Sequence, residues 1–254
     1  TLEIVFMEQL VAVVSYEVGA GYIEGETQVL LTPTGAPAIL PPAVKEASLE
    51  DLMAELDSLI GLVSIKRKLR EYTQYLNFLK IRAEKGFEDP QRISLHAVFM
   101  GNPGTGKTTV AKMLGQIYLK MGLLTKGHVH EVDRSDLVGE YIGQTAPKVK
   151  EAIKKAAGGI LFIDEAYALA RNKDDGKDYG REVIEILIKE MSDGTNGIAV
   201  LVAGYPEEMR TFLESNPGLK SRFNMYYDFP DYLPQELLQI AMYSMEKRAV
   251  KLTE

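Results

Sequence analysis

Residues 101–108 read Gly-Asn-Pro-Gly-Thr-Gly-Lys-Thr and directly follow the apolar run LHAVFM at 95–100. The stretch matches the pattern G-x-x-x-x-G-K-[ST], in which glycines let the backbone wrap closely round phosphate groups. A helix that starts at the end of such a loop adds the positive potential of its N-terminus. We predict a strand, a phosphate-binding loop and a helix, with Lys107 reaching the β- and γ-phosphates and the Thr108 hydroxyl binding Mg²⁺. The residues that we assign to the nucleotide are Asn102, Pro103, Gly104, Thr105, Gly106, Lys107, Thr108 and Thr109.

A second motif, Ile160-Leu161-Phe162-Ile163-Asp164-Glu165, places two carboxylates directly after an apolar strand. Ligands of open α/β sheets bind at the carboxyl ends of the strands. We expect Asp164 to hold Mg²⁺, and Glu165 to orient or deprotonate the attacking water. An apolar strand that ends in Asp-Glu is common by itself. Its position one βα unit beyond the phosphate loop makes the pair specific.

A third motif, Asn216-Pro217-Gly218-Leu219-Lys220-Ser221-Arg222-Phe223, reads as a turn between a helix and a strand. Arg222 is too remote from Asp164 in chain order to be an obvious contact of its own loop. An arginine delivered to the γ-phosphate of a neighbouring subunit would neutralise charge that develops in the transition state. The alternative is an ordinary surface arginine in a turn.

The rest of the chain alternates strands and helices, as in a parallel sheet with helices on both faces. Three of the expected strands are nearly continuous apolar runs, which favours burial from both sides and a three-layer α/β fold. We expect strands at 95–100, 128–132, 159–163, 198–203 and 225–229, and helices at 106–120, 145–157, 180–191 and 206–214.

Both flanks of this α/β region have a different pattern. Residues 1–44 combine short β-like runs with a proline-rich linker, which predicts a small β-rich N-terminal segment. Ser48 and Asp51 resemble a capping box for a helix, and a second helical pattern follows Gly61. We assign 45–230 to the nucleotide-binding domain. The remainder, 231–254, holds the start of an amphipathic helix.

Composition limits the class of protein. Apolar residues make up 46% of the chain, but no apolar run is long enough to span a membrane. There is no cysteine, which excludes disulfides and thiolate metal sites and fits a reducing cytoplasm. His128 and His130 have no clear third ligand, so we expect no further metal site. A net charge of −7 argues against binding to nucleic acid.

Taken together, the motifs resemble the AAA+ family, and within it the branch that contains stage V sporulation protein K and the red-type rubisco activase. The resemblance covers about residues 48–254 and is somewhat stronger to the sporulation protein. It implies that a homo-oligomeric ring, a hexamer in the full-length form, hydrolyses ATP and uses the energy to remodel or thread an unknown protein partner. It also implies a sporulation-linked role. The alternatives are a rubisco activase-like remodeller, a nucleotide-controlled assembly scaffold without threading, and a nucleic-acid motor. The most specific strings are GNPGTGKTTVAK, DLVGEYIGQTAPK, GGILFIDEAYALA, AGYPEEM and NPGLKSRF.

The resemblance also implies roles for individual residues. Gly61 and Leu62, with Ile60 before them, would flank the adenine, and Arg222 would be the arginine finger. Tyr141 and Ile142 would form the pore loop that grips a polypeptide; the alternative is that Tyr141 is an ordinary loop or core tyrosine.

A second pore loop would occupy Arg171–Gly180, and the strand before the phosphate loop would lie centrally in the sheet. Two departures stand out. Gly204-Tyr205 replaces the usual polar residue after the fourth strand, and the chain ends at Glu254, so we expect a truncated helical lid.

Overall fold

The structure is a computed structural model that describes residues 2–6, 9–14, 28–31, 37–40, 47–87, 94–141, 143–170, 179–194 and 196–247. The chain divides into two compact units. One comprises Thr1–Ala47 with Ala241–Glu254, and the other comprises Ser48–Ile240.

The N-terminal segment of the first unit contains two antiparallel strand pairs. Strand β1 (Leu2–Phe6) pairs with β2 (Gln9–Val14), and β3 (Gln28–Leu31) pairs with β4 (Pro37–Leu40). The expected β-rich N-terminal segment is therefore confirmed.

The second unit is built on a five-stranded parallel sheet with the order β6-β7-β8-β5-β9. All five predicted strands are present, within two residues of the expected bounds. Strand β5, which leads into the phosphate loop, lies inside the sheet between β8 and β9, whereas β8 is the middle strand. The strands are β5 (Ala97–Gly101), β6 (Val129–Val132), β7 (Ile160–Ile163), β8 (Ala199–Gly204) and β9 (Met225–Phe229).

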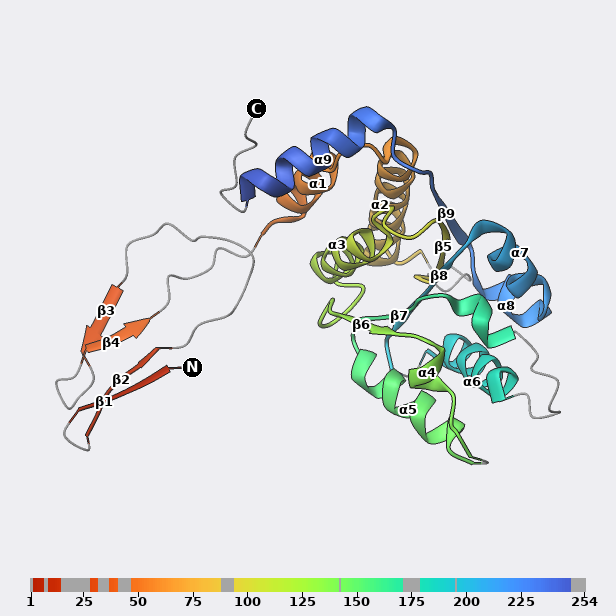
Figure 1. The fold of residues 1–254 in the computed structure, drawn as a ribbon, viewed down its shortest axis with the longest axis horizontal. Coiled ribbons are helices and arrows are strands. Elements are labelled where there is room, and N and C mark those ends of the chain that lie inside the picture. Colours follow the sequence, from red (N-terminus) through yellow and green to blue (C-terminus); the bar gives the residue numbers. More distant parts are fainter. Residues whose placement is uncertain are drawn as a thin grey trace. The chain divides into compact units, whose positions relative to one another are not determined.

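Helices cover both faces of this sheet (Figure 1). Besides the expected helices, the described residues contain three short ones, α4 (Arg134–Leu137), η1 (Ala166–Ala170) and α8 (Pro217–Arg222), which span too few residues for a periodic pattern to reveal. The expected capping box of Ser48 and Asp51 is formed at the start of α1. The helices are α1 (Leu49–Ser58), α2 (Val63–Glu84), α3 (Lys107–Lys120), α4 (Arg134–Leu137), α5 (Thr145–Ala156), η1 (Ala166–Ala170), α6 (Tyr179–Asp193), α7 (Pro206–Glu214), α8 (Pro217–Arg222) and α9 (Pro234–Lys247).

Alternate residues of each strand enter two separate cores, which gives the three layers. Phe99 and Phe162 pack with α1, α2 and α3 on one face, where Leu56, Leu69 and Ile117 are fully buried or nearly so. The neighbours of these strand residues point the other way, toward a core formed by α4, α5, α6, α7, α8 and η1. The α/β three-layer fold is therefore confirmed, and the apolar strands follow from burial on both sides. Within the described part of the chain, no helix is both long and apolar enough to cross a membrane.

Candidate active site

The phosphate loop connects β5 to α3 at the carboxyl edge of the sheet. Gly104 and Gly106 have φ of 77° and 92°. Residues other than glycine rarely adopt this left-handed backbone conformation. Gly106 caps α3 without a side-chain hydrogen bond, so the N–H groups of the first turn are available to an anion. The Thr105 hydroxyl donates to the Asn102 carbonyl at 2.7 Å, which holds the loop closed.

Lys107 follows this loop as the first residue of α3 and is only 8% exposed. Its ammonium donates to the carbonyls of Gly101 and Asn102 at 3.0 and 2.8 Å. Burial lowers the pKa of Lys107, while the carboxylates of Asp164 and Glu165 act in the opposite direction. The Lys107 ammonium therefore interacts electrostatically with both predicted catalytic carboxylates, Asp164 and Glu165.

The two carboxylates follow β7, next to the end of β6. The Asp164 N–H donates to the Val132 carbonyl at 2.9 Å, and the Glu165 N–H donates to the Asp164 side chain at 2.9 Å. Asp164 is half-buried, whereas Glu165 is exposed. Among the residues that the structure describes, Glu165 and Leu62 are the two non-glycine residues with positive φ. Such backbone strain is found mainly at functional sites, where the surrounding structure maintains it.

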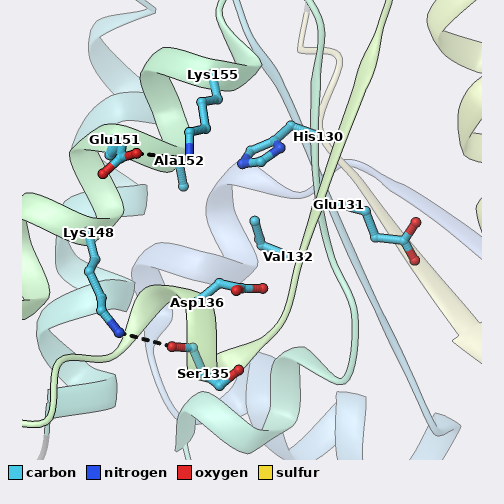
Figure 2. A pocket seen from close by; sticks show the side chains of 9 residues that line it. All are labelled: His130, Glu131, Val132, Ser135, Asp136, Lys148, Glu151, Ala152 and Lys155. Carbon is cyan, nitrogen blue, oxygen red and sulfur yellow. Dashed lines mark hydrogen bonds and ion pairs between the residues drawn. The ribbon is translucent and has the colours of Figure 1, made fainter.

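Glu131 on β6 was not predicted as a site residue. The Thr108 hydroxyl donates to its carboxylate at 3.4 Å. Figure 2 shows that Glu131 points away from its neighbour His130, as strand alternation requires, although both line the rim of one pocket. The other side of that pocket carries Lys155, which forms an ion pair with Glu151 at 2.8 Å. Glu131 thus faces the nucleotide loop, and its position near the end of β6 was the signal that could have revealed it.

The predicted adenine side lies against the phosphate loop. Leu62 is 5% exposed with φ of 54°, and its side chain lies 3.7 Å from the position that a Cβ on Gly106 would occupy. The Tyr232 hydroxyl donates to the Thr105 carbonyl at 3.3 Å, and the Asn102 amide donates to both Asp231 oxygens at 2.9 and 3.0 Å. Asp231 and Tyr232 were not predicted as site residues, although they lie shortly after the last strand at the same edge.

Arg222 is not brought to this edge. It ends α8 just before β9, and its carbonyl accepts a hydrogen bond from Ser94, which precedes β5. Because the strands are parallel, these residues lie at the amino edge of the sheet, and the five residues of β5 separate them from the phosphate loop by roughly 16 Å. The segment expected as a turn is a short helix, because the Asn216 side chain caps it and Pro217 starts it.

Tyr141 lies in the loop between α4 and α5 and is 67% exposed, so it is not a core residue. The base of the loop is fixed. The Gly139 N–H donates to the fully buried Thr145 hydroxyl at 3.1 Å, and the Lys148 ammonium donates to the carbonyls of Ser135 and Val138 at 3.2 and 3.0 Å. Ile142 and most of the predicted second pore loop, residues 171–178, lie outside the described residues.

Residues 97–231 match the family model described as "ATPase family associated with various cellular activities (AAA)". This region carries the phosphate loop and both carboxylates. The chain belongs to the AAA family. It is 45% identical over 210 residues to stage V sporulation protein K of Bacillus subtilis. The aligned region covers 83% of this chain and 64% of that protein. It is 48% identical over 222 residues to protein CbxX, chromosomal, of Cupriavidus necator, covering 85% and 69% of the two chains.

Another relative of this AAA chain is named ribulose bisphosphate carboxylase/oxygenase activase, chloroplastic, from Cyanidioschyzon merolae. It is 43% identical over 210 residues, which cover 82% of this chain and 71% of the relative. The resemblance inferred from the motifs is therefore confirmed at the level of family and branch. The aligned region spans less than two thirds of the length of the sporulation protein.

The structure gives a reason for the unusual Gly204 of this AAA chain. A Cβ at Gly204 would lie 2.6 Å from the ring of Tyr167 and 2.9 Å from the sulfur of Met209. The ring centroids of Tyr167 and Tyr205 are 5.9 Å apart. Aromatic packing thus fills the space that a polar side chain at Gly204 would need.

Proposed function

We propose that this chain hydrolyses ATP with Mg²⁺ and uses the energy to remodel or thread a protein partner as one subunit of a ring, a hexamer in the full-length form. One observation carries the proposal. Lys107, Asp164 and Glu165 lie at the carboxyl edge of the sheet, while Arg222 lies at the opposite edge. A site that needs all four residues is completed only when a second subunit contributes its Arg222.

The residues at the carboxyl edge fit a Mg²⁺-bound triphosphate. The uncapped first turn of α3 offers N–H donors, and the buried Lys107 offers an ammonium to phosphate oxygens. The Thr108 hydroxyl and the Asp164 carboxylate are the hard oxygen ligands that Mg²⁺ prefers. When bound there, Mg²⁺ would neutralise negative charge on the phosphates.

The remaining roles follow from position. The exposed Glu165 carboxylate orients a water molecule and takes its proton as the water attacks the γ-phosphate. Arg222 of the neighbouring subunit stabilises the charge that develops on the transferred phosphoryl group. Gly61 and Leu62 line the adenine side. We assign 1–44 to an N-terminal β-rich segment, 45–230 to the nucleotide-binding domain, and 231–254 to the start of the helical lid.

Threading is favoured over a purely nucleotide-controlled scaffold by the loop that carries Tyr141. Its base is held by Thr145 and Lys148, while the aromatic ring is in solvent. A ring displayed on a fixed base offers an apolar surface that grips a polypeptide without reading its sequence.

The name of the Bacillus subtilis relative supports a sporulation-linked role. The second candidate role is activation of rubisco, which is supported by the activase from Cyanidioschyzon merolae. An ATPase activity that responds to a sugar bisphosphate would favour the second role, and an ATPase activity that ignores it would favour the first.

A mixing experiment tests the shared site. Arg222→Ala and Glu165→Gln subunits are each expected to be inactive, but a mixture should recover hydrolysis, because some interfaces then pair an intact Glu165 with an intact Arg222. Co-purification of untagged Glu165→Gln subunits with affinity-tagged Arg222→Ala subunits establishes that mixed assemblies form. No recovery at any mixing ratio, with mixed assemblies present, rejects the shared site.

A further inference from the structure

The side chain of Arg222 is held by two hydroxyl groups. Its Nε–H donates to the Ser192 Oγ at 2.7 Å, and its Nη1 donates to the Ser221 Oγ at 2.8 Å. Ser192 stands at the C-terminal end of α6, thirty residues earlier in the chain. Its own hydroxyl hydrogen is directed at the Ile188 carbonyl, at 2.7 Å, and its oxygen accepts the hydrogen bond from the guanidinium.

The backbone on either side of Arg222 is fixed as well. The Ser94 hydroxyl donates to the Arg222 carbonyl at 3.3 Å, and Phe223 is 2% exposed. The Phe223 ring meets the His96 ring edge-on, with centroids 6.5 Å apart and planes at 78°. His96 in turn accepts a hydrogen bond from the Val200 N–H at 3.0 Å. These contacts tie the last turn of α8 to the starts of both β5 and β8.

The end of the guanidinium remains available. Of the five N–H donors of an arginine, those on Nη2 have no hydrogen-bond partner among the described residues. A cavity opens beside it, lined by Ser94, His96, Met191, Ser192, Ser221 and Arg222 among others. Nε and Nη1 are therefore anchored to the protein from two sides, while Arg222 lines the cavity at the amino edge of the sheet.

We propose that Ser192 is a positioning residue that presets the Arg222 guanidinium for the phosphates held by a neighbouring subunit. The inference rests on the proposed shared site. An unrestrained arginine side chain loses much of its rotamer freedom when it binds phosphate, and this loss opposes binding. An arginine already held through Nε has lost part of that freedom before the reaction, so the entropy cost of binding phosphate is smaller. Removal of the Ser192 hydroxyl should therefore slow hydrolysis without weakening ATP binding, because the nucleotide is bound at the other edge of the sheet.

The test compares Ser192→Val with Ser192→Thr in the full chain. Valine and threonine have the same shape, and only threonine keeps the hydroxyl. We expect Ser192→Val to lower kcat by about tenfold with KM for ATP unchanged, the size expected for losing a hydrogen bond to a charged group. Ser192→Thr should stay within about twofold of the unmodified chain. Ser192→Ala, which cannot clash, should match Ser192→Val and covers the case in which valine impairs folding.

A second readout separates positioning from a structural effect. Ser192→Val subunits mixed with Glu165→Gln subunits should recover hydrolysis, because the Glu165→Gln subunit supplies a correctly held Arg222 to the intact nucleotide site of its neighbour. A folding defect within the Ser192→Val subunit would impair its own nucleotide site and would not be repaired in this way.

The outcomes also separate this inference from the proposed function. Normal hydrolysis by Arg222→Ala would remove the role of Arg222 and with it the role of Ser192. If Arg222→Ala is inactive but the valine, alanine and threonine variants all hydrolyse ATP equally, the shared site stands and the positioning role of Ser192 is overturned. Absence of recovery in the mixture overturns it as well.

Discussion

The Lys107 ammonium donates a hydrogen bond to the Asn102 carbonyl at 2.8 Å, so the lysine closes the phosphate loop on itself. A triphosphate bound in this loop would present oxygens to the same ammonium. Lys107→Ala should therefore weaken ATP binding by at least tenfold and abolish turnover. Titration with a fluorescent ATP analogue measures the first effect, and phosphate release measures the second.

Lys112 provides a matched control for this change, since it is an exposed lysine on the same helix, α3. Lys112→Ala removes one positive charge at a similar point in the chain and should leave both measurements nearly unchanged. Equal losses in the two variants would show that general charge, and not the place of Lys107 in the loop, controls nucleotide binding.

Glu165 should separate binding from chemistry. In Glu165→Gln the side chain keeps its shape but no longer takes a proton, so ATP and Mg²⁺ should bind with unchanged affinity while hydrolysis falls by at least a hundredfold. Equilibrium binding and single-turnover hydrolysis on the same preparation measure the two quantities. Single-turnover hydrolysis at the rate of the unmodified chain would remove Glu165 from the chemical step. If the variant also retains an ATP-bound assembly, it provides a trap for recovering protein partners from a cell extract.

Tyr141 should affect the handling of polypeptide and not the hydrolysis of ATP alone. Because Tyr141 is 67% exposed, Tyr141→Ala should change the free energy of unfolding by less than about 0.5 kcal/mol. We expect basal hydrolysis within a few-fold of the unmodified chain, loss of the stimulation by an unfolded polypeptide such as casein, and retention of that stimulation in Tyr141→Phe.

Tyr75 serves as the comparison for Tyr141, because it is another exposed aromatic residue, at 49%, on α2. Tyr75→Ala should preserve both the basal and the casein-stimulated rate. If casein stimulates Tyr141→Ala as strongly as it stimulates the unmodified chain, the loop does not grip the polypeptide.

His96 should make folding sensitive to acid. Burial, with a smaller contribution from the charge of Arg222, lowers the pKa of His96 to about 4, against about 6.5 for a histidine in an unfolded chain. Between these values the unfolded chain binds more protons, so the free energy of unfolding falls as the pH drops. The contribution amounts to roughly 3 kcal/mol between pH 6.5 and 4.

Urea unfolding of the unmodified chain and of His96→Asn across this range measures the effect. The asparagine oxygen can still accept from the Val200 N–H but does not titrate, so the stability advantage of the unmodified chain over the variant should shrink as the pH falls. If the free energy of unfolding changes with pH in the same way for both proteins, the pKa of His96 does not differ between the folded and unfolded states as described.

The elements with a long repeating pattern could be predicted from the sequence. Three of the five parallel strands are nearly continuous apolar runs, and the phosphate loop is recognisable because eight consecutive residues carry all of its requirements. The short helices α4 and α8 escaped prediction. Their caps, Asp133 and Asn216, each act within three residues, and a helix of four to six residues has no periodic face.

The sequence by itself determined which residues of the nucleotide loop stand together, because Gly101 to Thr109 are neighbours in the chain and the motif needs no distant partner. Only the tertiary structure decided what surrounds them. Asn102 meets Asp231, Thr108 meets Glu131, and Arg222 meets Ser192. These pairs are separated by 23 to 129 residues. They depend on the strand order β6-β7-β8-β5-β9, which brings distant strand ends to one edge and keeps Arg222 at the other. That order results from the packing of helices on both faces of the sheet, and no local pattern of residues records it.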